Sequence, residues 1–177
     1  MIALVVGIAV LGVIELFHIA VTTALIRRVR EGASAPAVPD PGGPGIGEPG
    51  PRLDRLRESA GDAGLLVGFF SAGCDSCAVE APRFAAAIPE LGKAGLRPVA
   101  VFGGPAGNDR DTLTQLLAPV DTRLFDGAAR EAFRAFAIKA TPAFFLIHAD
   151  GTVRGKGTSA AEALISSNRR EPTESHV

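Results

Sequence analysis

The only two cysteines of the chain stand three positions apart, as Cys74 and Cys77, between an apolar run and a helical pattern. Two thiols separated by two residues at the first turn of a helix can close a disulfide. The unpaired N–H groups and the positive dipole end of such a helix favour the thiolate of the first cysteine. The spacing therefore predicts thiol–disulfide chemistry, with Cys74 as the nucleophile and Cys77 as the resolving thiol.

Two structural interpretations compete for this pair: a short-loop disulfide without a redox role, or two unreactive core thiols. Glu80, three residues after Cys77, is expected either to exchange a proton with Cys77 or to be a solvated acid of an early helical turn. Asp75 disfavours the Cys74 thiolate, because it adds a neighbouring negative charge. A disfavoured thiolate makes the dithiol a better electron donor, so we expect a reductase-leaning balance.

The composition bounds the other possibilities. The 177 residues, 47% of them hydrophobic, are enough for one globular core. The formal net charge of −1 and the lack of Trp and Tyr argue against a nucleic-acid partner. A four-ligand zinc site would need distant histidines beside the two cysteines, so no metal site is expected; the histidines are His18, His148 and His176. No dissociable cofactor is implied. His148 follows a strand pattern and is expected to be merely exposed.

The chain begins with 25 almost uniformly apolar residues, 2–26. As a helix they would extend about 37 Å at about 1.5 Å per residue, enough to cross a bilayer. We expect 1–31 to be a transmembrane anchor with a basic flank, and a cleaved signal peptide is the competing interpretation. Glu15, His18 and Thr22 share one helical face, which predicts either a polar seam against a membrane redox partner or groups that bond internally or attract water.

Residues 32–51 have the composition of a tether, because twelve of the twenty are Gly or Pro. Beyond them, apolar runs predict buried strands at 65–70, 98–102 and 143–147, the last in a hairpin with 152–153. Periodic or capped segments predict helices at 75–91, 109–118, 127–137 and 160–167. This order predicts an α/β sandwich around one mixed sheet over 52–167, followed by a disordered tail at 168–177.

The helix predicted at 75–91 follows the cysteines directly and should pack against the sheet. Pro82 is expected to bend it. The helix predicted at 109–118 is expected to be capped by Asn108 or Asp109. The core stripe of the first helix consists of Ala81, Phe84, Ile88 and Leu91.

With these motifs the chain resembles the thioredoxin superfamily, and more narrowly its membrane-tethered TlpA/ResA type and the MauD accessory proteins of methylamine dehydrogenase. Residues 74–82 match the family's Cys-x-x-Cys-x-x-Glu-x-Pro. Residues 138–147, Ile-Lys-Ala-Thr-Pro-Ala-Phe-Phe-Leu-Ile, are similar to the segment that carries the superfamily's cis-proline. Residues 45–49, Gly-Ile-Gly-Glu-Pro, resemble the sequence that leads into the domain of the tethered members.

The resemblance implies a thioredoxin-like fold, a central mixed sheet flanked by helices, behind an N-terminal transmembrane helix. It also implies disulfide exchange with client proteins, with Thr141 and a cis Pro142 binding an extended substrate; a trans proline at a strand edge is the alternative. Gly73 and Ser76 depart from the family's usual Trp and Pro, so the surface around Cys74 should be less apolar. A non-catalytic membrane adaptor and a metallochaperone remain the alternative functions.

The side of the membrane is predicted differently by two arguments. Arg27, Arg28 and Arg30 follow the apolar span and no Lys or Arg precedes it, so the positive-inside rule places the domain in the cytoplasm. The tethered family members work outside the cytoplasmic membrane. On that resemblance we expect a single-pass cell-membrane protein with an extracytoplasmic domain, acting on apocytochromes or on subunits of a secreted redox enzyme.

Overall fold

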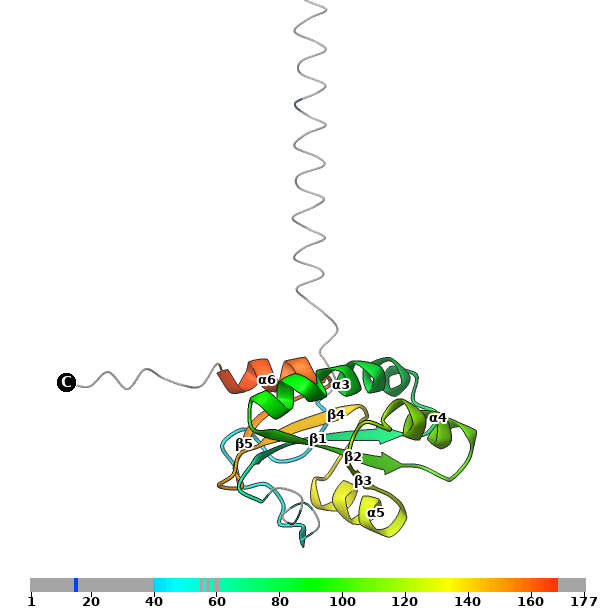
Figure 1. The fold of residues 1–177 in the computed structure, drawn as a ribbon, viewed down its shortest axis with the longest axis horizontal. Helices are drawn as coiled ribbons and strands as arrows, with labels where there is room; N and C mark the ends of the chain where they lie inside the picture. Colours follow the sequence, from blue (N-terminus) through cyan, green and yellow to red (C-terminus); the bar gives the residue numbers. More distant parts are fainter. Residues whose placement is uncertain (1–14, 16–39, 55, 57, 59–60, 169–177) are drawn as a thin grey trace, which may run out of the picture. The chain divides into compact units, whose positions relative to one another are not determined.

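A five-stranded mixed sheet in the order β3-β2-β1-β4-β5 forms the centre of the domain (Figure 1). The computed structural model describes residues 15, 40–54, 56, 58 and 61–168. β1 pairs in parallel with β2, and β2 with β3, whereas β4 pairs antiparallel with both β1 and β5. The strands are β1 (Gly64–Ser71), β2 (Leu96–Gly103), β3 (Thr122–Leu124), β4 (Ala143–Ile147) and β5 (Val153–Gly157).

Helices cover both faces of this sheet (Figure 1). They are α3 (Asp75–Lys93), α4 (Asn108–Leu116), α5 (Asp126–Ala135) and α6 (Ala160–Asn168). Successive side chains of a strand point to opposite faces, so β1 contributes to two separate cores. Leu66 and Phe70 pack with side chains of α3, α4 and α6, while Val67 and Phe69 pack with those of α5.

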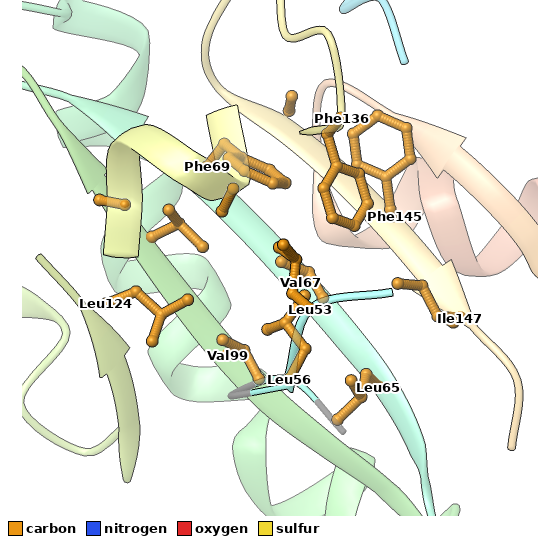
Figure 2. Close-up of a cluster of buried hydrophobic side chains, with 14 of the residues drawn as sticks. Leu53, Leu56, Leu65, Val67, Phe69, Val99, Leu124, Phe136, Phe145 and Ile147 are labelled. Atoms are coloured by element: carbon orange, nitrogen blue, oxygen red, sulfur yellow. The ribbon is translucent and has the colours of Figure 1, made fainter. Parts of the chain in front are cut away.

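Figure 2 shows the second of these cores. The ring centroid of Phe69 lies 5.0 Å from that of Phe136 and 5.9 Å from that of Phe145. Leu53 and Leu56, which precede β1, also belong to this core (Figure 2). β1 is thus buried on both faces, which fixes the position of the turn at its carboxyl end.

The predicted strands and helices are confirmed, with several corrections at their boundaries. β3 was not predicted, because its three residues are too short to give a period-2 pattern. The predicted cap of α4 is wrong: Gly107 is the N-cap, with no side-chain cap bond, and Asn108 is already helical. α3 stays helical through Pro82. β5 extends to Gly157, well beyond the predicted 152–153.

The prediction that the tether reaches Pro51 is wrong for residues 40–51, which lie along the domain. Gly42 forms a β-bridge with Ile138, and the Lys139 N–H donates to the Pro41 carbonyl at 2.9 Å. At Gly43 φ is 83°, and a Cβ there would lie 2.6 Å from the Phe145 ring. Glycine is therefore what lets this segment approach the sheet closely, whereas its composition alone indicated an unpacked chain.

The predicted anchor at 1–31, apart from Glu15, lies outside the described residues, as do His18, Thr22 and the tail from residue 169 onward. In the part of the chain that the structure describes, no helix has both the length and the apolar composition needed to span a bilayer.

Candidate active site

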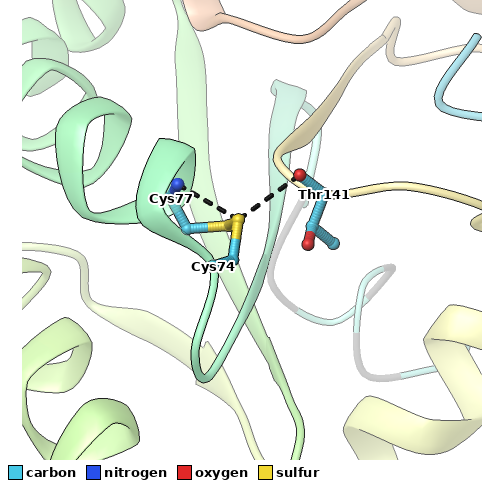
Figure 3. Close-up of a disulfide and its surroundings, with 3 residues drawn as sticks. All are labelled: Cys74, Cys77 and Thr141. Atoms are coloured by element: carbon cyan, nitrogen blue, oxygen red, sulfur yellow. Dashed lines mark hydrogen bonds between the residues drawn. A yellow bond between two sulfur atoms is a disulfide. The ribbon is translucent and has the colours of Figure 1, made fainter. Parts of the chain in front are cut away.

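Cys74 lies where β1 ends and α3 begins. The turn between them passes through Gly73, whose φ of 74° belongs to the left-handed region that glycine adopts without strain. Cys74 is the N-cap of α3, and its Sγ accepts the N–H of Cys77 at 3.2 Å (Figure 3). A backbone N–H and the start of the helix dipole both favour negative charge on this sulfur.

A disulfide joins Cys74 to Cys77, with their Cα atoms 5.2 Å apart (Figure 3). The two sulfurs differ in burial: Cys77 is fully buried and packs in the core under α3, whereas Cys74 is partly exposed. Another molecule can therefore reach Cys74 but not Cys77. The predicted roles of nucleophile and resolving thiol require this asymmetry.

The loop before β4 meets the cysteine pair from the other side. The cis peptide bond expected between Thr141 and Pro142 is confirmed. The carbonyl oxygen of Thr141 lies 3.3 Å from Cys74 Sγ, although the two residues are 67 positions apart (Figure 3). A groove of about 360 Å³ opens beside them, lined by Ser76, Val79, Glu80, Ala140, Thr141, Pro142, Thr158 and Ser159.

Glu80 lies in this groove, one helical turn after Cys77. Its side chain is 14% exposed, and its carboxylate accepts a hydrogen bond from Arg83 at 2.6 Å. Arg83 was not singled out from the sequence, although the i, i+3 spacing on a helix would have indicated the pair. The structure brings Glu80 to the site, and its exchange of a proton with Cys77 stays a prediction.

The residues exposed around Cys74 have small or polar side chains. Gly73, Asp75 and Ser76 are all exposed. A Cβ placed on Gly73 would lie 3.8 Å from a carboxylate oxygen of Asp109 on α4. The sequence indicates Asp109 only as a helix cap, because its proximity to this turn depends on how α4 packs.

His148 lies away from the site, exposed after β4, with Nδ1 3.5 Å from the Asp150 carboxylate. Hydrogen bonds from Thr152, and then Arg154, hold the pKa of Asp150 well below its usual range. Within the described residues, no three His, Cys, Asp or Glu side chains gather in a way that could hold a metal ion.

Comparison with known proteins identifies the fold. No family model and no curated protein matches the chain. The chain is similar to the solved thioredoxin domain of a thiol-disulfide oxidoreductase from Bacteroides vulgatus, at 15% identity and a TM-score of 0.57 over 71% of this chain and 97% of that one. A thioredoxin-family thiol:disulfide interchange protein from Chlorobium tepidum matches at 18% identity and a TM-score of 0.54 over the same shares.

A thiol:disulfide interchange protein from Bacteroides sp. matches at 15% identity and a TM-score of 0.54, over 75% of this chain and 95% of that one. These identities are low, so the likeness concerns the arrangement of the backbone. The domain that holds Cys74 and Cys77 has the thioredoxin-like fold.

Proposed function

We propose that this protein is a thiol–disulfide oxidoreductase that exchanges disulfides with client proteins. One observation carries the proposal: a partly exposed Cys74 at the start of α3 is disulfide-bonded to a fully buried Cys77, beside the cis Pro142. The names of the structural neighbours, which are thiol-disulfide oxidoreductases, agree with it.

The reaction begins with the reduced pair. The Cys74 thiolate, held by the Cys77 N–H, attacks one sulfur of the client disulfide, and the other client sulfur leaves as a thiolate. Cys77 loses its proton and its thiolate attacks Cys74 Sγ, which releases the second client thiolate. Two electrons pass to the client, and the Cys74–Cys77 disulfide seen in the structure forms. A thiol protein must then reduce this disulfide again.

The groove beside Thr141 suits an extended client segment. The Thr141 carbonyl is directed at Cys74, so a segment lying along residues 140–142 would bring its own disulfide to the exposed sulfur. Glu80 is the carboxylate in this groove that would take the proton of Cys77.

The direction of transfer is proposed to be reductive. Asp75 and Asp109 place two carboxylates around the turn that holds Cys74, and both oppose the effect of the helix start on the thiolate. A less stable thiolate disfavours the dithiol relative to the disulfide, so the dithiol gives up its electrons more readily.

The proposal also covers location. The apolar stretch at 2–26 supports a single-pass anchor in the cell membrane, and the resemblance to tethered family members supports an extracytoplasmic domain. Apocytochromes or subunits of a secreted redox enzyme would be the clients, and a membrane redox partner would contact Glu15 and His18. The positive-inside rule favours the opposite side, so a reporter fused after Val177 that is active only in the cytoplasm would reverse this assignment.

Trapping of mixed disulfides tests the proposal. In a Cys77→Ser variant Cys74 should retain client proteins covalently, in complexes that a reductant releases. A Cys74→Ser variant is the matched control and should retain none. The parent protein should also catalyse insulin reduction in the presence of a dithiol. A parent protein without activity and a Cys77→Ser variant without adducts would contradict the proposal and favour a non-catalytic adaptor.

A further inference from the structure

A second hollow, of about 660 Å³, lies at the carboxyl ends of β1 and β2. It is on the β2 side of the turn that holds Cys74, whereas the groove at Thr141 is on the β4 side, because β2 and β4 are the two neighbours of β1. We call this hollow the arginine pocket. Two aromatic rings give it an apolar lining and three arginines give it charge; its defining residues are Ser71, Phe102, Arg110, Arg130, Phe133 and Arg134.

The arginine pocket has more positive than negative charge. Arg110 is mostly buried and pairs with Asp126 at 2.9 Å, so these two charges compensate each other. Arg130 and Arg134 are exposed and stand four residues apart on α5, which places them on one face of the helix. Within the part of the chain that the structure describes, neither makes an ion pair. Glu131 lies between them in sequence but outside the pocket lining.

The pocket is continuous with the active-site turn. Ser71 is three residues before Cys74, a separation that an extended chain spans in roughly 11 Å. The Ala72 N–H donates to the Gly103 carbonyl at 3.1 Å, and a Cβ on Gly104 would lie 3.1 Å from the Ala72 Cβ. A polypeptide joined to Cys74 can therefore reach the pocket with residues close to its own cysteine.

We propose that the arginine pocket binds acidic residues that flank the disulfide of the client polypeptide. This inference rests on the proposed function. Guanidinium groups bind carboxylates through paired hydrogen bonds, and clusters of arginines recognise acidic peptide motifs. Phe102 and Phe133 add apolar surface for the stems of such side chains. Asp75 and Asp109 repel acidic residues at the turn itself, so the preference applies to positions displaced from the client cysteine.

Two synthetic peptides with the same disulfide ring test this proposal. One carries two Asp residues on each side of the ring, displaced by two positions, and the other carries Asn at the same places. The reduced full-length chain, in non-ionic detergent at low ionic strength, should reduce the Asp peptide about 3- to 10-fold faster in a single turnover, the effect of one or two exposed ion pairs. High salt should bring the ratio of the two rates towards one.

A double variant, R130E with R134E, should lower this ratio to one or below. The matched control is K93E with R123E, which changes the net charge by the same amount outside the arginine pocket and should keep the ratio. A parent ratio of one, or a ratio that survives in the R130E/R134E variant, overturns the inference while the proposed function stands. If the parent reduces neither peptide, the proposed function fails and this inference fails with it.

Discussion

Reducing the Cys74–Cys77 disulfide is expected to lower the free energy of unfolding of the domain by about 2 kcal/mol. The disulfide closes a loop with a sequence separation of three. For a loop this short, the chain-entropy relation gives a loss of about 6 cal/mol/K in the unfolded state, or about 2 kcal/mol at 25 °C. The buried Cys77 contributes little to the difference, because a free thiol packs as a small hydrophobe.

This stability difference also predicts a shift of the reduction potential, because a thermodynamic cycle links folding to reduction of the disulfide. The oxidised and the reduced form differ in unfolding free energy. This difference equals the difference between the free energy of reducing the disulfide in the folded chain and that of reducing it in the unfolded chain. Since 1.4 kcal/mol corresponds to about 30 mV, a difference of about 2 kcal/mol lowers the reduction potential of the folded pair by about 40 mV relative to the unfolded pair. A reductase-leaning protein must therefore be more stable when oxidised.

Urea unfolding of the full-length chain, with and without a reductant, measures the difference. Circular dichroism is the suitable signal, because the chain has neither Trp nor Tyr. A variant with both cysteines replaced by serine is the control and should unfold at the same urea concentration under both conditions. A reduced form as stable as the oxidised form, or more stable, would refute the reasoning, since strong protein oxidants stabilise their reduced form.

Three substitutions extend these expectations. Asp75→Asn removes a negative charge beside Cys74 and should lower the pH at which this thiol becomes alkylated by roughly 0.5 unit. The reduction potential should rise, because the thiolate becomes more stable. An unchanged alkylation profile would contradict the argument. Gly155→Ala puts a Cβ onto the carbonyl oxygen of Ala163 in α6 and should lower the free energy of unfolding by about 3 kcal/mol in thermal or urea unfolding; an unchanged stability would contradict this close approach. Ala137→Gly relieves a φ of 49° and should raise the unfolding free energy by up to about 1 kcal/mol, whereas a loss would show that this backbone is unstrained.

Much of the fold follows from local patterns in the sequence. The run at 143–147 was predicted with the bounds that β4 has, and the run at 65–70 lies within β1. Both are continuous apolar segments because these strands are buried on both faces. β3 is too short for such a pattern, and residues 40–51 pack through backbone bonds and glycines that composition does not distinguish from a loose tether.

The residues of the candidate site also fall into those that a local sequence pattern predicts and those that it does not. Cys74 and Cys77 are predicted by their own spacing and by the helical pattern after them. Thr141 is 67 positions from Cys74, so no local pattern indicates their contact, and only the resemblance to a family suggested it. The arginine pocket depends on how α4 and α5 pack at the carboxyl end of β2, for which the sequence offers no comparable motif.

The position of β1 in the sheet would let one sulfur serve as the selective exchange site that we propose. Since β1 has β2 on one side and β4 on the other, the turn at its carboxyl end has two flanks of different chemistry. The β4 flank offers the Thr141 carbonyl and a groove for extended backbone. The β2 flank offers the exposed guanidinium groups of Arg130 and Arg134, for which the described residues provide no ion-pair partner. A client that fits both flanks presents its disulfide to Cys74 with the orientation already determined, so selectivity requires no change in the chemistry of the cysteine pair.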